Sequence, residues 1–272
     1  MYICIDVGGT KTLVAHINED GNILEQVRIA TPQDYQEFLK QVKEAVSSFK
    51  TQDFTYCAIA IPVTSLNREK GIAKTFANLK WRNVAIADDL GKILNCPILV
   101  ENDAKLGGLY EAMDVKDQFS NVLYLTIGTG IGISVINNLR IDLSAGDAGG
   151  SSILINQDSK LVPWESLASG KAIQHIYGKR AEEIDDDNTW EEISNYLSLG
   201  LINLISIFQP EVVIIGGGVG YYCDKFSGFL RNNLANYDLP LITMPEIKKA
   251  KKATEAVVYG CYEYIKQHIN HG

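Results

Sequence analysis

The sequence predicts an α/β protein made of two similar lobes with a central cleft between them. Short apolar strands alternate with helical patterns, and one order of elements occurs twice along the chain. In each half, a strand, a glycine turn, a returning strand and a hairpin precede helices that alternate with single strands. We predict an N-terminal lobe at 1–104, joined by a C-terminal helix at 254–269, and a C-terminal lobe at 105–253.

The first half begins with a nearly continuous apolar run. Apolar and alternating runs predict strands at 2–7, 12–17, 23–30, 56–63 and 96–100. Apolar residues at helical spacing predict helices at 33–49, 84–94 and 104–113. The polar, irregular segment 66–81 is predicted to be a loop.

The second half repeats this plan. Strands are predicted at 122–127, 131–136, 140–143 and 212–215. Helices are predicted at 164–177, 190–208, 222–234 and 254–268. The acidic segment 182–187 lacks the spacing of a calcium-binding loop, and we predict that it and the basic run 248–252 are solvated surface segments.

Composition excludes several classes of function. With 272 residues and a formal net charge of −8, the chain lacks the basic character of a nucleic-acid-binding protein. No apolar run approaches the roughly 18 residues of a membrane span, and no signal peptide pattern is visible. Cys4, Cys57 and Cys96 lie in or beside apolar strands and are predicted to be buried free thiols. We therefore expect a cytoplasmic protein without nucleic-acid or membrane partners.

Two glycine turns, Gly8-Gly9-Thr10-Lys11 and Gly128-Thr129-Gly130, carry the residues that a phosphate site needs. Glycines let backbone N–H groups approach an anion, and a threonine hydroxyl adds a donor. A single turn of this kind would be interpreted as a plain hairpin, but two equivalent turns favour phosphate binding. The chain has no P-loop motif, and Gly128–Gly132 leads into a strand pattern, unlike a dinucleotide fingerprint. Gly216–Gly220 precedes a helix and stays a candidate for nucleotide contact.

Two aspartates stand beside predicted strand ends. Asp6 interrupts an apolar strand before the first glycine turn, where it either holds Mg²⁺ through water or is satisfied by the N–H groups of the turn. Asp103 follows strand 96–100, at the edge where open α/β sheets place their ligands. Because Asn102 or Asp103 can cap the following helix, a helix cap and a catalytic base are the two interpretations of Asp103.

Four motifs in this order resemble the ROK family of sugar kinases and repressors: Asp6-Val-Gly-Gly-Thr-Lys11, Glu101-Asn-Asp-Ala104, Gly128-Thr-Gly-Ile-Gly132 and Gly216-Gly-Gly218. The resemblance runs nearly end to end. It implies the two-lobed fold of the actin/hexokinase/Hsp70-like ATPases, with duplicated ribonuclease-H-like domains. It also implies ATP- and Mg²⁺-dependent phosphoryl transfer to a sugar hydroxyl, and a homodimer.

The resemblance assigns roles to residues of this chain. It implies that Asp103 is the general base, that Asp6 is the Mg²⁺-site acid, and that Asn102, Asn78 and Glu165 contact the sugar. The nucleotide-binding residues that it implies are Gly8, Gly9, Thr10, Lys11, Gly128, Thr129, Gly130, Gly217 and Gly218.

The chain departs from the family pattern on the sugar side. Gly150-Ser151-Ser152-Ile153 replaces the family's Glu-x-Gly-His motif, and Ile61-Pro62-Val63 replaces its Gly-Pro-Gly loop. Segment 156–163 has no cysteine where the family carries a zinc motif, so we expect no structural zinc. A sugar- or nucleotide-binding regulator without catalytic activity is therefore the alternative function. Polyphosphate in place of ATP also stays open, and the sequence does not identify the sugar.

Overall fold

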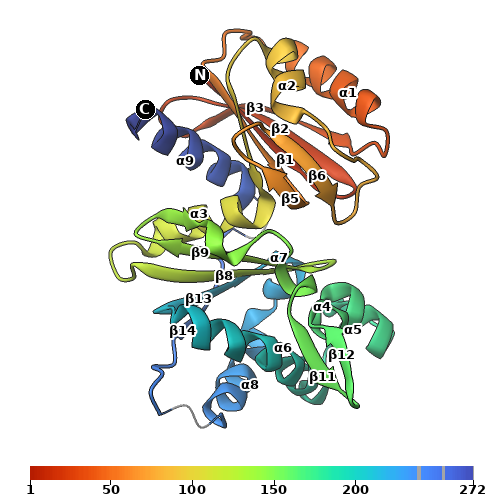
Figure 1. Ribbon diagram of the computed structural model, residues 1–272, viewed down its shortest axis with the longest axis vertical. Helices are drawn as coiled ribbons and strands as arrows, with labels where there is room; N and C mark the ends of the chain where they lie inside the picture. Colours follow the sequence, from red (N-terminus) through yellow and green to blue (C-terminus); the bar gives the residue numbers. More distant parts are fainter. Residues whose placement is uncertain (238–239, 253–254, 272) are drawn as a thin grey trace. The chain divides into compact units, whose positions relative to one another are not determined.

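The computed structural model describes residues 1–237, 240–252 and 255–271 and forms two compact units (Figure 1). Unit 1 contains Met1–Tyr110 and Glu255–Gly272, and unit 2 contains Glu111–Thr254. Each unit has its own mixed sheet and its own hydrophobic core.

Unit 1 is built on a five-stranded sheet. Its strands are β1 (Tyr2–Val7), β2 (Lys11–Ile17), β3 (Ile23–Ala30), β4 (Tyr56–Ile61) and β7 (Ile98–Asn102), with a separate hairpin of β5 (Val63–Asn67) and β6 (Ile72–Phe76). Its helices are α1 (Tyr35–Ser47), α2 (Ile86–Leu94) and α9 (Ala256–His271), and α3 (Asp103–Val115) begins directly after β7.

The strand order of this sheet is β3-β2-β1-β4-β7. β1 pairs antiparallel with β2 and parallel with β4, and β4 pairs parallel with β7. In this register Asp6 lies opposite Ala60, and Ala60 lies opposite Glu101. Parallel pairing thus brings the ends of β1 and β7 to one edge of the sheet.

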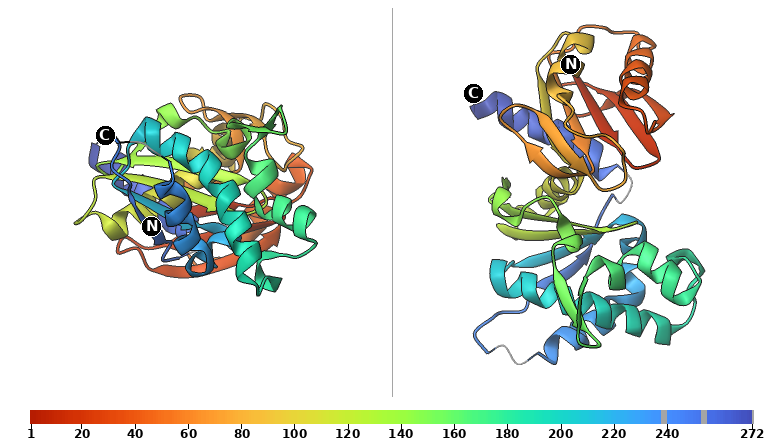
Figure 2. Two further views of the ribbon diagram at one scale, coloured as in Figure 1. Left: turned by 90° about the horizontal axis from the view of Figure 1, so that it is seen from below. Right: turned by 45° about the vertical axis from the view of Figure 1, so that its right-hand side comes forward.

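The two faces of the first sheet are covered by different helices. Ile3, Ile5 and Val7 of β1 belong to the same buried core as Phe38 of α1 and Leu90 of α2. Helix α9 packs along β1 and β4, as the two ribbon views show (Figure 1, Figure 2).

Unit 2 repeats the plan. Its strands are β8 (Asn121–Ile127), β9 (Ile131–Asn137), β10 (Arg140–Asp142), β13 (Val212–Gly216) and β14 (Glu246–Lys249), with a separate hairpin of β11 (Leu154–Gln157) and β12 (Lys160–Pro163). Its helices are α4 (Glu165–Ala168), α5 (Gly170–Tyr177), α6 (Asp187–Phe208), α7 (Gly217–Gly220) and α8 (Cys223–Ala235).

The strand order β10-β9-β8-β13-β14 reproduces that of unit 1, with three antiparallel strands followed by two parallel ones. The duplication predicted from the order of elements is therefore confirmed. α6 packs against α8, and Trp164 fills the space beside Gly200 of α6, where an added Cβ would lie 2.1 Å from the indole ring.

Several local predictions were wrong. The predicted loop 66–81 contains most of the β5–β6 hairpin. The predicted helix 164–177 breaks at Ser169, which has an extended backbone and whose Oγ caps α5 by accepting the Ala172 amide at 3.2 Å. Segment 182–187 is exposed as predicted except at Ile184, and it holds a short 3₁₀ turn and the cap of α6, since Asp186 accepts the Thr189 amide at 2.9 Å.

The lysines of the basic run 248–252 are exposed or partly exposed, as predicted, and Lys248 and Lys249 also belong to the edge strand β14, which pairs with β13. Thr254, the predicted start of the last helix, lies outside the described residues.

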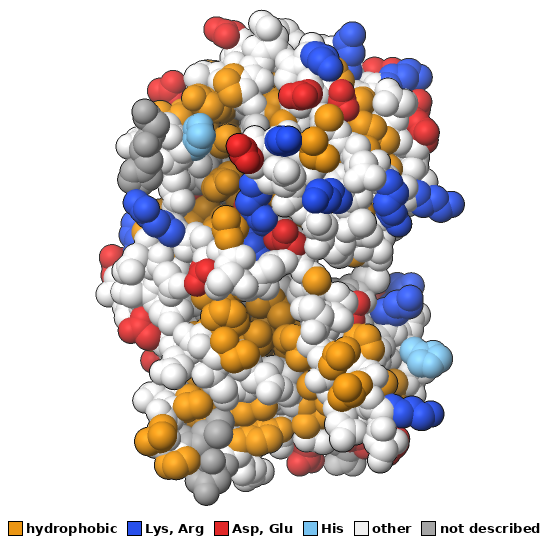
Figure 3. Space-filling view, viewed as in Figure 1, with side chains coloured by type: hydrophobic (Ala, Val, Ile, Leu, Met, Phe, Trp, Pro, Cys, Tyr) orange, Lys and Arg blue, Asp and Glu red, His pale blue; other side chains and the backbone are white. Residues whose placement is uncertain are grey.

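All five cysteines are free thiols, and Cys4 and Cys57 are buried as predicted, whereas Cys96 is half-buried. Within the described ranges, every helix is too short or too polar to cross a membrane. Exposed large hydrophobic side chains include Leu154, Leu161 and Ile207 of unit 2, and hydrophobic surface is visible over this unit in Figure 3.

Candidate active site

The first glycine turn lies between β1 and β2 in unit 1. The Gly8 amide donates to the Lys11 carbonyl at 2.9 Å, and the Thr31 hydroxyl donates to the Gly8 carbonyl at 2.8 Å. Neither bond uses the amides of Gly9 and Thr10, and the Thr10 side chain is exposed. The turn therefore offers donors of the kind that a phosphate group requires.

Asn78 lies directly against this turn. A Cβ added at Gly9 would be 3.1 Å from the Asn78 Cβ, so the absence of a side chain at Gly9 permits the close approach. Asn78 is exposed, and its carbonyl oxygen accepts a long hydrogen bond from Gln33 Nε2 at 3.5 Å. The structure thus places the expected sugar-side residue beside the expected phosphate loop of the same unit.

Asp6 lies in β1 two residues before this turn. Burial and the charge of Asp103 raise the pKa of Asp6 to about 7, while the charge of Arg28 lowers it. Leu13 stands between Asp6 and Arg28 in the sheet register, which explains the effect of Arg28. The positive charge of Arg28 therefore does not offset the burial of Asp6, and a bound cation would supply further compensation.

The carboxylates of Asp6 and Asp103 suit Mg²⁺ better than they suit a metal ion that is bound by protein ligands alone. Among the described residues, no group of three or more His, Cys, Asp or Glu side chains is arranged to hold a metal ion. Mg²⁺ usually keeps several waters and is bound by one or two carboxylates together with substrate phosphates. Asp6, with Asp103 close enough to affect its pKa, matches that donor set.

The turn from β7 into α3 shows which residue caps the helix. Asn102 Oδ1 accepts the Lys105 amide at 3.1 Å, as an N-cap does, and Asn102 Nδ2 donates to the Val63 carbonyl at 3.0 Å. Asp103 is the first residue of α3, and its Oδ1 accepts the amide of Ala104 at 2.8 Å. Asn102 therefore supplies the cap, and the Asp103 carboxylate is not needed for it.

Burial changes the acidity of Asp103. It raises the pKa of Asp103 to about 6, although the amides of Ala104 and of Asp103 itself and the charge of Lys105 lower it. Near neutral pH the group is then a carboxylate with a higher proton affinity than an ordinary aspartate. These are the properties of a general base.

The second glycine turn lies between β8 and β9 in unit 2. The Gly128 amide donates to the Gly130 carbonyl at 2.9 Å, and the Gly170 amide donates to the Gly128 carbonyl at 2.7 Å. A Cβ added at Gly170 would be 2.7 Å from that carbonyl oxygen, so the close packing of α5 on the turn requires glycine there. Thr129, at the tip of the turn, is exposed.

Glu165 and Gly217 lie against this second turn. Glu165 Oε2 accepts the Ile131 amide at 3.3 Å, which places the carboxylate next to Gly130. Gly217 has a φ of +81°, and a Cβ added there would be 2.6 Å from the Ile127 carbonyl oxygen. Gly218 follows it and is exposed.

The predicted site residues thus form two sets, one in each unit. Unit 1 brings together Asp6, Gly8, Gly9, Thr10, Lys11, Asn78, Asn102 and Asp103. Unit 2 brings together Gly128, Thr129, Gly130, Glu165, Gly217 and Gly218.

The segment that departs from the family pattern forms a 3₁₀ turn at Gly149–Ser151. The Ser151 hydroxyl donates to the Ala148 carbonyl at 2.5 Å, and the Ser152 hydroxyl donates to the Gly149 carbonyl at 2.8 Å. Both hydroxyl protons are therefore used within the turn.

An ion pair next to Asp103 was not predicted from the sequence. Arg68 Nη2 and Glu101 Oε1 are 2.6 Å apart, and Glu101 directly precedes the Asn102-Asp103 pair. The available signal was a glutamate that continues an apolar strand, which is costly to bury without a partner. Arg68 itself lay in a segment predicted to be a loop.

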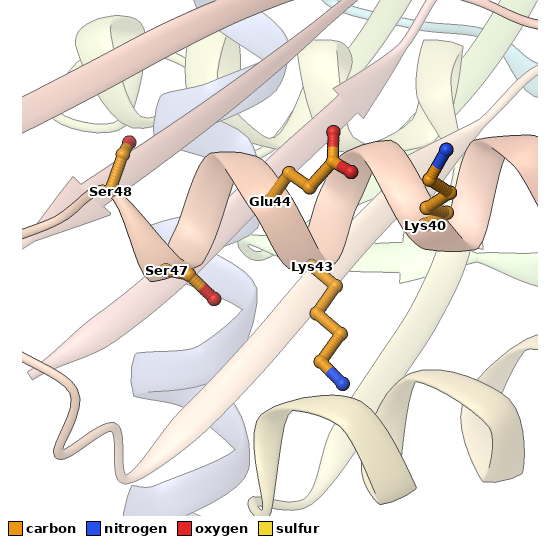
Figure 4. A pocket seen from close by; sticks show the side chains of 5 residues that line it. All are labelled: Lys40, Lys43, Glu44, Ser47 and Ser48. Carbon is orange, nitrogen blue, oxygen red and sulfur yellow. The ribbon is translucent and has the colours of Figure 1, made fainter.

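A shallow hollow of about 520 Å³ lies beside α1. Its lining side chains, Lys40, Lys43, Glu44, Ser47 and Ser48, come from α1 and its C-terminal end (Figure 4). None of the predicted site residues lines it, so it is separate from the candidate active site.

Comparison with known proteins identifies the family. The model of the ROK family matches residues 2–268. The chain belongs to the ROK family. It is 27% identical over 286 residues to a fructokinase from Lactococcus lactis subsp. cremoris, covering 96% of this chain and 97% of the fructokinase. A xylose repressor from Caldicellulosiruptor bescii is 25% identical over 74% of this chain and 60% of the repressor.

Solved structures agree with the fold. A ROK family glucokinase from Streptomyces griseus, solved with glucose and AMPPNP, superposes with a TM-score of 0.81 at 20% identity, covering 98% of this chain and 99% of the glucokinase. The predicted α/β class and two-lobed actin-like fold are thereby confirmed, as is the resemblance to ROK sugar kinases.

Proposed function

We propose that this ROK-family chain is a carbohydrate kinase that transfers the γ-phosphoryl group of ATP, with Mg²⁺, to a hydroxyl of a sugar or sugar derivative. The observation that carries the proposal is the environment of Asp103. Its carboxylate lies at the ligand-binding edge of the sheet, has a pKa of about 6 and is relieved of capping by Asn102.

In this proposal Asp103 accepts the proton of the acceptor hydroxyl as that oxygen attacks the γ-phosphorus. Such transfer depends mainly on positioning and charge stabilisation, so a single base, two phosphate loops and a metal acid meet most of the requirement. Asn102 retains one amide hydrogen and one carbonyl lone pair for a sugar hydroxyl after its internal bonds. Asn78 and Glu165 are the further sugar contacts that we propose.

Asp6 would hold Mg²⁺, chiefly through water. When bound, the ion neutralises charge on the transferring phosphates. The amides of Gly9 and Thr10 and the Thr129 hydroxyl would bind phosphate oxygens, and Gly217 with Gly218 would contact the adenosine. The glucokinase relative, solved with a sugar and an ATP analogue, supports this pairing of ligands.

The test is sugar-dependent ADP release by the purified protein. The panel contains glucose, fructose, N-acetylated hexoses and ring-opened polyols, each with ATP and with polyphosphate as donor. We expect at least one sugar to stimulate ADP formation from ATP. Transfer from polyphosphate releases no ADP, so that arm is read as sugar phosphate formed. If no sugar is phosphorylated with either donor, the kinase proposal is refuted.

A second candidate is a sugar-binding regulator without catalysis. The observation that favours it is the 3₁₀ turn at Gly149–Ser151, where serines with engaged hydroxyl protons replace the expected acid and histidine. A buried sugar hydroxyl without a partner costs about 1–3 kcal/mol. Calorimetric binding of a sugar without any ADP release would favour this candidate over the kinase.

We also propose a homodimer, on the family resemblance, and a cytoplasmic location. Sedimentation analysis of the purified protein tests the first, since a monomer at micromolar concentration would refute it. Fractionation of cells that express the protein tests the second.

A further inference from the structure

A buried ion pair stands next to the proposed base. Arg68 lies in the turn between β5 and β6, and Glu101 is the residue of β7 that precedes Asn102. Arg68 Nε donates to Glu101 Oε2 at 2.7 Å, and Arg68 Nη2 donates to Glu101 Oε1 at 2.6 Å. The Glu101 side chain is 1% exposed and that of Arg68 is 24% exposed. Two parallel bonds of this kind fix the orientation of both groups.

The pair continues into the backbone that carries Asp103. Glu101 Oε1 also accepts the Asn102 amide at 2.7 Å, so the guanidinium and the peptide before the base share one carboxylate oxygen. Asn102 is held further by its bonds to the Val63 carbonyl and the Lys105 amide. The backbone amide of Asn102 and both ends of its side chain are thus held directly before Asp103.

The same contacts hold the β5–β6 hairpin. Arg68 binds β7 from the tip of the hairpin, and Val63 binds Asn102 from its base. The Ala77 amide donates to the Pro62 carbonyl at 3.0 Å, which closes the base of the hairpin. The next residue is Asn78, which lies against Gly9.

Stability alone is a weak explanation for this pair. Two charges lose much hydration when they are buried, and replacing a buried ion pair by apolar residues of similar size is often neutral or stabilising. The bonds of Glu101 are directed at the strand end that carries the proposed base, which indicates a role in geometry.

We propose that Arg68 and Glu101 are positioning residues that hold the Asp103 carboxylate and the Asn78 loop in register with each other for phosphoryl transfer. This inference rests on the proposed kinase function. Neither residue needs to touch the substrate, because both act through the β7–α3 turn. A displacement of about 1 Å at a reacting group lowers a rate by up to roughly 100-fold.

The test compares steady-state kinetics of the full chain with its best sugar. Arg68→Met and Glu101→Gln are expected to lower kcat by about 10- to 100-fold while the KM for ATP changes by less than about twofold. Arg68→Lys keeps the positive charge but loses the two parallel guanidinium hydrogen bonds. Its kcat should lie between that of Arg68→Met and that of the wild type. The control is Lys40→Met, which removes an exposed ion pair to Glu37 on α1 and should leave kcat unchanged.

A double variant keeps the test decisive if a single variant folds poorly. Arg68→Met with Glu101→Met removes both charges and should regain the Tm of the wild type, with kcat still at least tenfold low. If kcat returns together with Tm, or if the well-folded single variants keep wild-type kcat, the inference is overturned and the kinase proposal stands. If the wild type itself phosphorylates no sugar, both are refuted.

Discussion

Acidification should inactivate the enzyme through Asp103. Burial places the pKa of Asp103 at about 6, and the form that accepts a proton is the carboxylate, so activity is lost as pH falls through that value. The ionised fraction is about 0.9 at pH 7, about 0.5 at pH 6 and about 0.1 at pH 5. We therefore expect kcat/KM for the sugar to fall roughly tenfold between pH 7 and pH 5.

The assay is initial-rate ADP formation at saturating ATP and Mg²⁺, with folding checked by circular dichroism at each pH. An aspartate with an ordinary pKa near 3.9 would still be about nine-tenths ionised at pH 5. The pH at which activity falls therefore distinguishes a raised pKa from an ordinary one. Asp6, whose pKa is raised to about 7, is kept ionised by the saturating Mg²⁺ that we propose it holds, so the fall in activity reports Asp103.

The matched control is Asp53→Asn, which removes an exposed carboxylate between α1 and β4. It should leave the fall of activity at acidic pH unchanged. A flat profile down to pH 4.5 in folded protein would refute the assignment. The assignment would also be refuted if the residual activity of Asp103→Asn fell at the same pH as that of the wild type.

Three further predictions concern stability and metal. Gly200→Ala should lower the free energy of unfolding in urea by about 1–3 kcal/mol, because the new Cβ meets the buried Trp164 ring. Gly228→Ala, in open space on α8, should raise it by up to about 1 kcal/mol, and equal effects of the two would contradict the packing. Asn102→Ala should cost about 0.5–2 kcal/mol by loss of the α3 cap, and an unchanged Tm would argue against that cap. Chelation of Mg²⁺ should abolish sugar-dependent ADP release until Mg²⁺ is restored, and activity that survives chelation would refute the role of Asp6.

The sequence was informative where structure is decided by short-range chemistry. The glycine turns and the strand ends that carry Asp6 and Asp103 were predicted because apolar runs end in glycine or in a polar residue within a few positions. The competition between Asn102 and Asp103 for the helix cap was recognised but left open. A side-chain bond to the Lys105 amide decides it, and that bond needs coordinates.

The missed features depend on contacts between distant residues. Arg68 and Glu101 are 33 positions apart, and the polar β5–β6 hairpin resembles a loop until that pairing is known. Strand β14 was not predicted because its lysines are equally typical of a solvated surface segment. Lysines are also common on edge strands, where they hinder pairing with another chain. Its parallel pairing with β13 runs from Val212 opposite Glu246 to Ile215 opposite Lys249.

The most direct test of the account is a comparison of wild-type protein with Asp103→Asn. Both are assayed for sugar-dependent ADP release, and ATP binding is measured by calorimetry. We expect the substitution to lower kcat by about 10²- to 10⁴-fold and to leave the Kd for ATP within about twofold, because the base acts only on the sugar hydroxyl. Turnover at the wild-type rate in Asp103→Asn would contradict the central claim that Asp103 is the base.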